Sequence, residues 1–237
     1  MISLYLPFYN EKDIIEENTI KVLKKLEEIK QDFEIILVDD GSTDSSSKIA
    51  DQLPKKHKEI RVLHYQGTPT RRENLAKSFK EAKGDTIVFM DIDLATSLEH
   101  LPMLIEALKK NDIVIGSRKV PGSQTDRELF RKALSLGYTT FVKTLFKSKI
   151  HDFQCGFKAF KKDIILKLVE EAGYDNTLKR GWAWDVEILI RAEKKHLRIK
   201  ELPVKWTCGT NSSLNIGREL NVIPYFLELR KKLYPKA

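Results

Sequence analysis

The chain has 237 residues, of which 41% are hydrophobic and 32% are charged, so it can bury a sizeable core and is not a disordered protein. Lys and Arg outnumber Asp and Glu by 42 to 34, which gives a net charge of +8 and favours an anionic partner without identifying it. Two cysteines, Cys155 and Cys208, are too few for a disulfide scaffold.

The sequence also carries expectations about location. The N-terminal residues lack the basic and apolar segments of a signal peptide. No apolar stretch approaches the roughly 20 residues of a membrane-spanning helix. We therefore expect a cytoplasmic protein that does not span a membrane but can bind to its surface.

Short apolar runs alternate with longer segments of helical period in the first half of the chain. This alternation is typical of β-α-β units and predicts an α/β fold with a mostly parallel central sheet flanked by helices. The expected strands are Ile2–Phe8, Glu34–Val38, Ile60–His64, Thr86–Met90 and Ile113–Gly116. The expected helices between them are Lys12–Lys30, Asp44–Leu53, Glu73–Ala82 and Leu98–Lys109.

The second half is less regular, and it begins with a polar loop at Arg118–Asp126. No linker-like boundary separates the halves, so we expect one domain, 1–237, with a nucleotide-binding half, 1–117, and a second half, 118–237. The elements expected in the second half are helices at Glu128–Lys147, Trp184–Lys195 and Ile216–Leu233 and a strand at Ile199–Val204.

Polar residues follow three of the expected strands, where ligands bind in open α/β sheets. Pro7, Asn10 and Glu11 lie at the end of the first strand, the run Asp39–Asp44 follows the second, and Asp91 and Asp93 follow the fourth. Asp-Gly-Ser is also ordinary turn chemistry, so helix capping is the alternative for the second group.

Asp91 and Asp93 are two residues apart directly after a buried strand, so both should lie on the same side. Two neighbouring carboxylates repel each other unless a cation or a proton intervenes. Mg²⁺ or Mn²⁺, completed by water and phosphate oxygens, would fit such a pair. The structural alternative is that Asp93 caps a helix and Asp91 is solvated.

Six blocks along the chain have an informative order and spacing. They are Leu6–Glu11, Val38–Asp44, Met90–Leu94, Gly116–Arg118, Asp152–Lys158 and Trp184–Glu187. With these blocks the sequence resembles the family 2 glycosyltransferases, and among them the dolichyl-phosphate glucosyltransferases and mannose synthases. The resemblance implies the GT-A fold, a Rossmann-like nucleotide-sugar domain, and makes 1–117 the nucleotide-sugar-binding half.

The resemblance also implies roles for the residues at the strand ends. Asp91 and Asp93 correspond to the DxD motif, whose metal, Mg²⁺ or Mn²⁺, bridges the donor diphosphate, and Asp93 thereby counts among the catalytic residues. The nucleotide-sugar site would contain Pro7, Tyr9, Asn10, Glu11, Asp39, Asp40, Gly41, Ser42, Asp91, Ile92 and Asp93.

The acceptor implied by the resemblance is a polyprenyl phosphate. Arg118 and Arg131 would bind its phosphate, with Ser135 one helical turn beyond Arg131; for Arg127 a solvated surface position is favoured. Asp152, Asp185 and Glu187 are candidates for a general base, which a hydroxyl acceptor needs and an already ionised phosphate does not.

Two segments depart from the family pattern. Thr70–Ala76 lacks the glycine common near this point, which puts its contact with the donor in doubt. In the glucosyl branch of the family, an acidic residue followed by Gly-Ser-Lys tends to occur where this chain has Thr207–Ser213. This difference weakens the assignment of the sugar and of the acceptor. Trp182 and Trp184 are equally compatible with core packing and with sugar stacking.

Two amphipathic stretches with basic flanks, Tyr138–Ile150 and Ile216–Leu233, can reach a membrane surface, or else pack on the sheet. A membrane partner protein is the other route to a lipid acceptor.

The favoured function is inverting transfer of a hexose from UDP-glucose or GDP-mannose to polyprenyl phosphate. The alternatives are transfer to a hydroxyl and a non-catalytic phosphate- or nucleic-acid-binding module; the scattered basic residues argue against a nucleic-acid partner.

Overall fold

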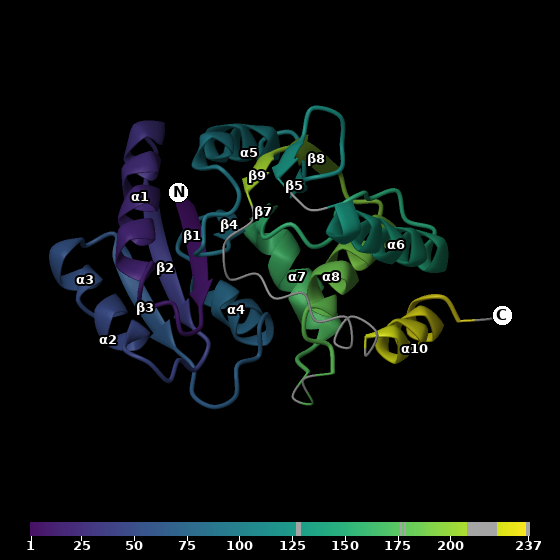
Figure 1. The fold of residues 1–237 in the computed structure, drawn as a ribbon, viewed down its shortest axis with the longest axis horizontal. Coiled ribbons are helices and arrows are strands. Elements are labelled where there is room, and N and C mark those ends of the chain that lie inside the picture. Colours follow the sequence, from purple (N-terminus) through teal and green to yellow (C-terminus); the bar gives the residue numbers. More distant parts are fainter. Residues whose placement is uncertain (127–128, 176, 178, 208–221, 236–237) are drawn as a thin grey trace.

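The computed structural model describes residues 1–126, 129–175, 177, 179–207 and 222–235. A mixed sheet of seven strands forms its centre, in the order β3-β2-β1-β4-β7-β5-β8 (Figure 1). β7 pairs antiparallel with β4 and β5, and the remaining neighbours pair parallel. The strands are β1 Ile2–Phe8, β2 Phe33–Asp39, β3 Ile60–His64, β4 Thr86–Met90, β5 Ile113–Ser117, β7 Phe157–Lys161 and β8 Ile199–Pro203.

Helices pack on both faces of the sheet because its strands are apolar on both sides. Two hydrophobic cores result, one on each face. Leu4 and Leu6 of β1 belong to one core and pack against a first group of helices, whereas Tyr5 belongs to the other core and packs against a second group. The first group is α1 Ile15–Ile29, α2 Ser46–Ala50, α3 Leu53–Lys56 and α5 Leu101–Leu108. The second is α4 Glu73–Ser78, α6 Leu129–Phe146, α7 Lys162–Ala172, α8 Ala183–Lys194 and α10 Ile223–Leu233.

The α/β fold predicted from the alternation is confirmed, and several element boundaries are corrected. The expected helix Asp44–Leu53 is two short helices, α2 and α3, and Pro54 lies in the first turn of the second one, where its missing N–H costs nothing. The expected helix Leu98–Lys109 begins with a 3₁₀ turn at Leu98–His100 before α5. β7 and α7 were not expected.

A second, two-stranded sheet lies beside the end of β4. It pairs β6 Gln124–Asp126 with β9 Lys205–Thr207. Trp206 of β9 also forms a bridge with Thr96, shortly after the predicted Asp91-Asp93 pair. The residues after β9, up to 221, lie outside the described part of the chain, and so does Cys208.

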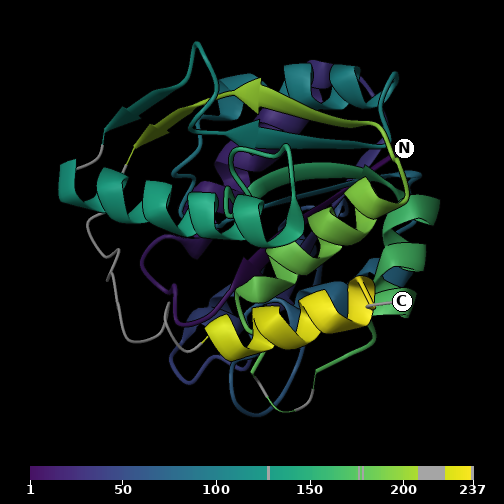
Figure 2. The same cartoon turned by 90° about the vertical axis from the view of Figure 1, so that its right-hand side faces the viewer.

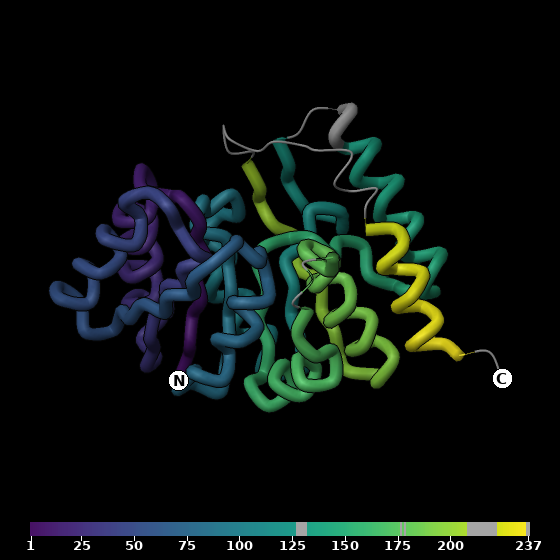
Figure 3. The backbone as a smooth tube through the Cα atoms, turned by 90° about the horizontal axis from the view of Figure 1, so that it is seen from below, coloured from purple at the N-terminus to yellow at the C-terminus, as the bar shows by residue number. Residues whose placement is uncertain are grey.

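The last described helix, α10, packs on the body of the protein. Its Phe226 is buried against the rings of Tyr138, Phe141 and Phe146 of α6, and Figures 2 and 3 show α10 beside α8 and α6. Within the described residues, no helix is both long and apolar enough to cross a bilayer.

Candidate active site

The strand ends bring most of the predicted residues to one edge of the sheet. β1, β2 and β4 run parallel and end at Phe8, Asp39 and Met90. β7 runs the opposite way, and its first residue, Phe157, pairs with Met90. The chain therefore enters β7 beside the end of β4, and the Asp91 N–H donates to the Gly156 carbonyl over 3.0 Å.

Asp39 is nearly buried and accepts three hydrogen bonds. Its Oδ1 accepts from the Ser42 N–H at 2.8 Å, and its Oδ2 contacts Ser47 Oγ at 2.5 Å and His64 Nδ1 at 3.0 Å. Although burial acts in the opposite direction, these bonds hold the pKa of Asp39 below its usual value. The carboxylate is thus a fixed anionic acceptor in the wall of an open hollow of about 510 Å³.

The loops after β1 and β2 are joined to each other. Asn10 Oδ1 accepts hydrogen bonds from the N–H groups of Thr43 and Asp44 at 2.7 and 3.2 Å, and the Glu11 N–H donates to Ser46 Oγ at 2.7 Å. Asn10 has a φ of 57°, which asparagine tolerates better than most residues. The two sequence blocks around Asn10 and Thr43 therefore form one surface.

The outer positions of this surface differ in exposure. Tyr9 is 39% exposed and Pro7 is half-buried. Gly41 has a φ of 85° and lies against the Gly67 carbonyl, so that a Cβ at Gly41 would be 2.4 Å from that oxygen. Only glycine fits this turn, which borders the same hollow.

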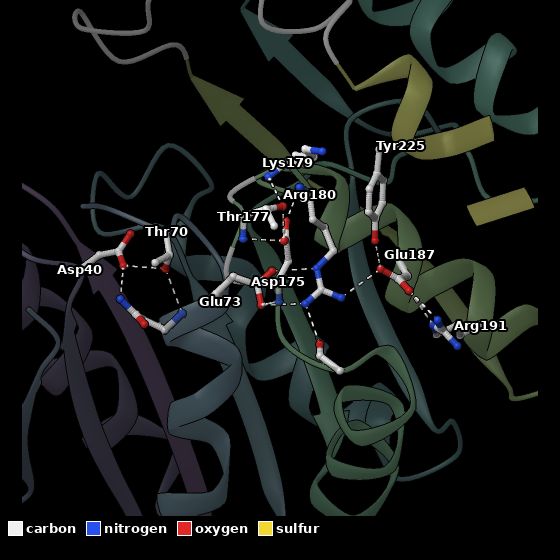
Figure 4. Close-up of polar contacts among 12 residues, drawn as sticks. Asp40, Thr70, Glu73, Asp175, Thr177, Lys179, Arg180, Glu187, Arg191 and Tyr225 are labelled. Atoms are coloured by element: carbon white, nitrogen blue, oxygen red, sulfur yellow. Dashed lines mark hydrogen bonds and ion pairs between the residues drawn. The ribbon is translucent and has the colours of Figure 1, made fainter. Parts of the chain in front are cut away.

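Asp40 faces away from this hollow, toward the segment before α4. Its Oδ1 accepts from Thr70 Oγ1 at 2.8 Å (Figure 4). The same oxygen accepts from Asn74 Nδ2 at 2.7 Å, and Oδ2 accepts from the Arg71 N–H at 2.6 Å. These hydrogen bonds connect Asp40 to α4 and to the segment before it, and they occupy both of its carboxylate oxygens. The predicted role of Asp40 in nucleotide-sugar binding stays a prediction.

Asp91 and Asp93 lie together, as predicted. Asp91 Oδ1 accepts from Arg72 Nη2 at 3.1 Å, and Asp93 Oδ1 accepts from the Ala95 N–H at 3.0 Å. Both of these hydrogen bonds use Oδ1, and the Oδ2 of Asp91 lies against Gly156. Part of Asp93 reaches solvent, yet burial by the surrounding chain and the charge of Asp91 raise its pKa. Burial and the charge of Asp93 likewise raise the pKa of Glu11.

Ile92, between them, is buried, and its carbonyl accepts from Asn18 Nδ2 at 2.9 Å. Its side chain therefore belongs to the core and is not available to a ligand. Burial and the neighbouring carboxylates disfavour the charged forms of Asp93 and Glu11, and a divalent cation would offset both effects. The described residues contain no cluster of three or more His, Cys, Asp or Glu side chains that could hold a metal.

Arg72, a buried cation, connects the Asp91-Asp93 pair to Asp185. Arg72 is 3% exposed, its Nε donates to Asp185 Oδ2 at 3.0 Å, and its guanidinium lies 4.7 Å from the centre of the Trp182 ring. Lys158 Nζ binds the other oxygen of Asp185 at 2.6 Å. Although burial opposes the effect, Lys158 and Arg72 hold the pKa of Asp185 below its usual value.

Glu187 lies in a second buried ionic chain, which Figure 4 shows. Its Oε2 accepts from Arg180 Nη1 at 3.0 Å and from the Tyr225 hydroxyl, and its Oε1 accepts from Arg191 Nη2 at 2.6 Å. Arg180 also binds both oxygens of Glu73 at 2.7 Å. The chain thus runs from α4 through α8 to α10.

Asp152 and Arg118 form a buried bidentate pair. Arg118 Nε and Nη2 donate to Oδ2 and Oδ1 of Asp152 at 2.7 and 2.8 Å, and the Arg118 N–H adds a third bond at 3.0 Å. Although burial opposes the effect, Arg118 holds the pKa of Asp152 well below its usual range. The guanidinium also lies 5.5 Å from the Trp206 ring centre.

The remaining residues predicted to bind the acceptor lie in or near α6. The Ser135 carbonyl accepts from Lys119 Nζ at 3.0 Å, and Ser135 is half-buried. The side chain of Arg131 and all of Arg127 lie outside the described part of the structure. Their roles stay predictions.

Three residues were missed by the reasoning from sequence. Arg72 lies in the segment whose contact with the donor was in doubt because it lacks a glycine, and the structure makes it the link between Asp91 and Asp185. Gly156 lies in the block Asp152–Lys158, but the sequence did not indicate its contact with Asp91. His64 ended an expected strand, and the one available signal was a histidine at a strand's carboxyl end. Trp184 is core, packed on Phe79 and Phe89.

The sequence profile described as Glycosyl transferase family 2 matches residues 3–169, well over half of the chain. The protein belongs to this family. This family 2 glycosyltransferase is 35% identical over 224 residues to Glycosyltransferase AglD of Haloferax volcanii, covering 92% of the chain and 35% of AglD.

Dolichyl-phosphate glucosyltransferases are also similar to this family 2 glycosyltransferase. The Dictyostelium discoideum protein is 31% identical, with 90% of the chain and 68% of that protein covered. The Saccharomyces cerevisiae protein is 29% identical, with coverages of 86% and 66%. The chain thus spans about a third of AglD and about two thirds of these relatives.

Solved structures share the fold. Glucosyl-3-phosphoglycerate synthase from Mycobacterium tuberculosis in complex with UDP matches with a TM-score of 0.68 at 19% identity, over 97% of this chain and 80% of that one. The same enzyme in complex with Mn²⁺, UDP and glucosyl-3-phosphoglycerate gives 0.65 at 18% identity, over 97% and 79%. The expected GT-A fold is confirmed.

Proposed function

We propose that the protein transfers a hexose, with inversion, from a nucleotide sugar to a polyprenyl phosphate. One observation carries the choice of acceptor. The three carboxylates expected to act as a general base, Asp152, Asp185 and Glu187, are all buried and held on both oxygens by cationic side chains.

A carboxylate in this state is a poor proton acceptor. The pKa values of Asp152 and Asp185 are lowered by their cationic partners, and neither has an unpaired oxygen facing solvent. A hydroxyl acceptor must lose a proton as it attacks, whereas a phosphate monoester, with a second pKa of about 6, is already largely ionised at neutral pH. The site therefore favours an acceptor that brings its own anionic nucleophile.

The donor side follows from the hollow and the carboxylate pair. The hollow bordered by Asp39, Gly41 and Ser42 suits the nucleoside, and Asp39 is a fixed acceptor for base or ribose donors. Asp91 and Asp93 would hold Mg²⁺ or Mn²⁺ through their Oδ2 atoms, with diphosphate and water oxygens completing the shell. When bound, the ion supplies Lewis-acid stabilisation of the leaving nucleoside diphosphate.

The acceptor side rests on Arg118 and on the basic helices. Nη1 of Arg118 is not part of the fork that binds Asp152, so it remains for the acceptor phosphate, together with Arg131 and Ser135. The named activity of the dolichyl-phosphate glucosyltransferases supports this class of acceptor. UDP-glucose is favoured over GDP-mannose by the same relatives and by the UDP-bound structures.

We also propose that the enzyme acts at the cytoplasmic face of a membrane, bound to its surface or to a membrane partner. α10 covers the core with Phe226, Leu229 and Leu233, which leaves Leu227 exposed on the same helix as Lys231 and Lys232, and Leu136 of α6 is a second exposed apolar residue. Flotation with anionic liposomes tests this, and a protein that stays in the soluble fraction at low salt would contradict it.

Transfer assays test the reaction. Purified protein is given UDP-glucose or GDP-mannose, with Mn²⁺ or EDTA, and either a short polyprenyl phosphate or the matching polyprenol. We expect metal-dependent transfer to the phosphate and none to the polyprenol. Transfer to the alcohol or to a soluble sugar hydroxyl would instead support the alternative acceptor, and the absence of any donor turnover would contradict the proposal.

A further inference from the structure

We infer that His64 is a positioning residue for the donor, which fixes Asp39 in the wall of the nucleoside hollow and makes nucleotide affinity depend on its own protonation. This inference rests on the proposed function, because it takes the hollow to be the nucleoside site. It goes further in assigning a role to a residue outside the blocks that carry the family resemblance.

The imidazole of His64 lies between two carboxylates from different elements. Its Nδ1 is 3.0 Å from Oδ2 of Asp39, at the end of β2, and its Nε2 is 2.9 Å from Oδ1 of Asp51, which follows α2. The His64 side chain is 40% exposed and, with both carboxylates, borders the hollow. The other groups around the hollow, such as Ser47, Tyr65 and Gln66, are uncharged near neutral pH.

Both contacts can be hydrogen bonds only when the ring is protonated. The imidazolium donates from both nitrogens, whereas either neutral tautomer donates from one and turns a lone pair toward the other carboxylate. Loss of the proton therefore breaks one of the two contacts. Although partial burial acts in the opposite direction, the bonds to Asp39 and Asp51 raise the pKa of His64, so this change falls at a higher pH than for an ordinary histidine.

A purely structural role accounts less well for this arrangement. Asp39 already has two other donors, Ser42 and Ser47, and a half-exposed imidazole adds little to a core. What His64 adds is a fixed direction for Oδ2 and a positive charge beside a site for an anionic ligand. Both effects favour nucleotide binding, and both weaken as the pH rises through the pKa of His64.

Calorimetric titration of the full chain with UDP and with GDP, at saturating Mg²⁺ from pH 5.5 to 8.5, tests the inference. His64→Ala removes the contact, and His64→Asn keeps an uncharged N–H donor close to the position of Nδ1. The control is His57→Ala, at the end of α3 and away from the hollow. The Kd of each variant is divided by that of the wild type at the same pH, which cancels the titration of the nucleotide and of the metal site.

We expect His64→Ala to weaken nucleotide binding roughly threefold to tenfold at pH 6, the range of a lost hydrogen bond. The ratio for His64→Asn should approach 1 at pH 8.5 and rise as the pH falls. In transfer assays the change should appear in KM for the donor and leave kcat at saturation nearly unchanged. His57→Ala should bind as the wild type does.

Distinct outcomes separate the two proposals. If the wild type binds neither UDP nor GDP, the proposed function fails and this inference with it. If the wild type binds but both ratios stay at 1 across the pH range, His64 has no positioning role and the proposed function stands. Should His64→Ala fail to fold, His64→Asn decides, because a pH-independent ratio of 1 for that variant also overturns the inference.

Discussion

Gly156 lies so close to Asp91 that any Cβ at this position would displace the Asp91 carboxylate. A Cβ built on Gly156 would be 1.8 Å from Oδ2 of Asp91 and 2.2 Å from its Cγ. The same glycine accepts the Asp91 N–H through its carbonyl. The backbone at the start of β7 is thus the surface against which the Asp91 carboxylate rests.

Gly156→Ala should therefore displace Asp91 while leaving the sheet intact. We expect the apparent affinity for Mn²⁺ to fall roughly 10- to 100-fold, the range found when groups that orient metal ligands are altered, and metal-dependent turnover to fall with it. Metal titration of transfer activity measures both. Gly137→Ala is the control, because no atom lies within 4 Å of its added Cβ, and it should stabilise α6 by about 1 kcal/mol. Equal metal affinity in both variants would contradict this assignment.

Arg118 and Arg198 provide a comparison of the same ion pair in two environments. Each donates through Nε and Nη2 to an aspartate, but the Arg118 side chain is 9% exposed and that of Arg198 is 61% exposed. Arg118→Met should cost about 3 to 5 kcal/mol because it leaves Asp152 buried without its partner. Arg198→Met should change the free energy of unfolding far less, because solvent screens this exposed pair. Urea unfolding measures both, and equal losses would refute the buried pair as a stabilising element.

Tyr225 is the contact by which α10 joins the ionic chain of α4 and α8. Tyr225→Phe should lower the free energy of unfolding by about 1 to 2 kcal/mol, since Glu187 loses a hydroxyl donor but keeps its two arginines. Tyr174→Phe, at a 49% exposed position, should change it by less than about 0.5 kcal/mol. An unchanged unfolding midpoint for Tyr225→Phe would show that this hydrogen bond does not stabilise the docking of α10.

Asp112 should account for part of the stability that the protein loses as the pH falls. Hydrogen bonds from Arg198 and Lys161 lower its pKa in the folded protein. A carboxyl with a depressed folded pKa adds stability above its unfolded value, near 3.9, and this stability is lost as the pH falls toward the folded pKa. Urea midpoints from pH 6 to pH 2.5 should therefore fall less steeply for Asp112→Asn than for the wild type. Parallel curves would contradict the lowered pKa.

Local patterns were enough to predict much of the sheet. The bounds expected for β1, β3 and β4 agree with the structure, because each is a short, mostly apolar run with polar residues after it. β7 was missed because two of the five residues of Phe157–Lys161 are lysines, so the segment is not a continuous apolar run. Lys158 is nevertheless 1% exposed, because its ammonium group is paired with Asp185 of α8.

The contents of the site were predictable only in part. Asp91 and Asp93 follow one strand, so their proximity comes from local geometry. Arg72 and Asp185 are 113 residues apart and Arg180 and Glu73 are 107 apart, and no local pattern pairs such distant charges. The sequence therefore shows Asp152, Asp185 and Glu187 as candidate general bases but does not show the cationic side chains that hold them.

The antiparallel direction of β7 also bears on how new specificity can arise on this scaffold. β5 ends and β7 begins at the edge of the sheet that holds the candidate active site, so the chain between them, with β6 and α6, leaves from that edge and returns to it. This one excursion carries all three residues proposed to bind the acceptor phosphate, Arg118, Arg131 and Ser135. Under the proposed function, a change of acceptor preference can therefore arise within one insertion, whereas the loops after β1, β2 and β4, which are proposed to hold the donor, lie outside it.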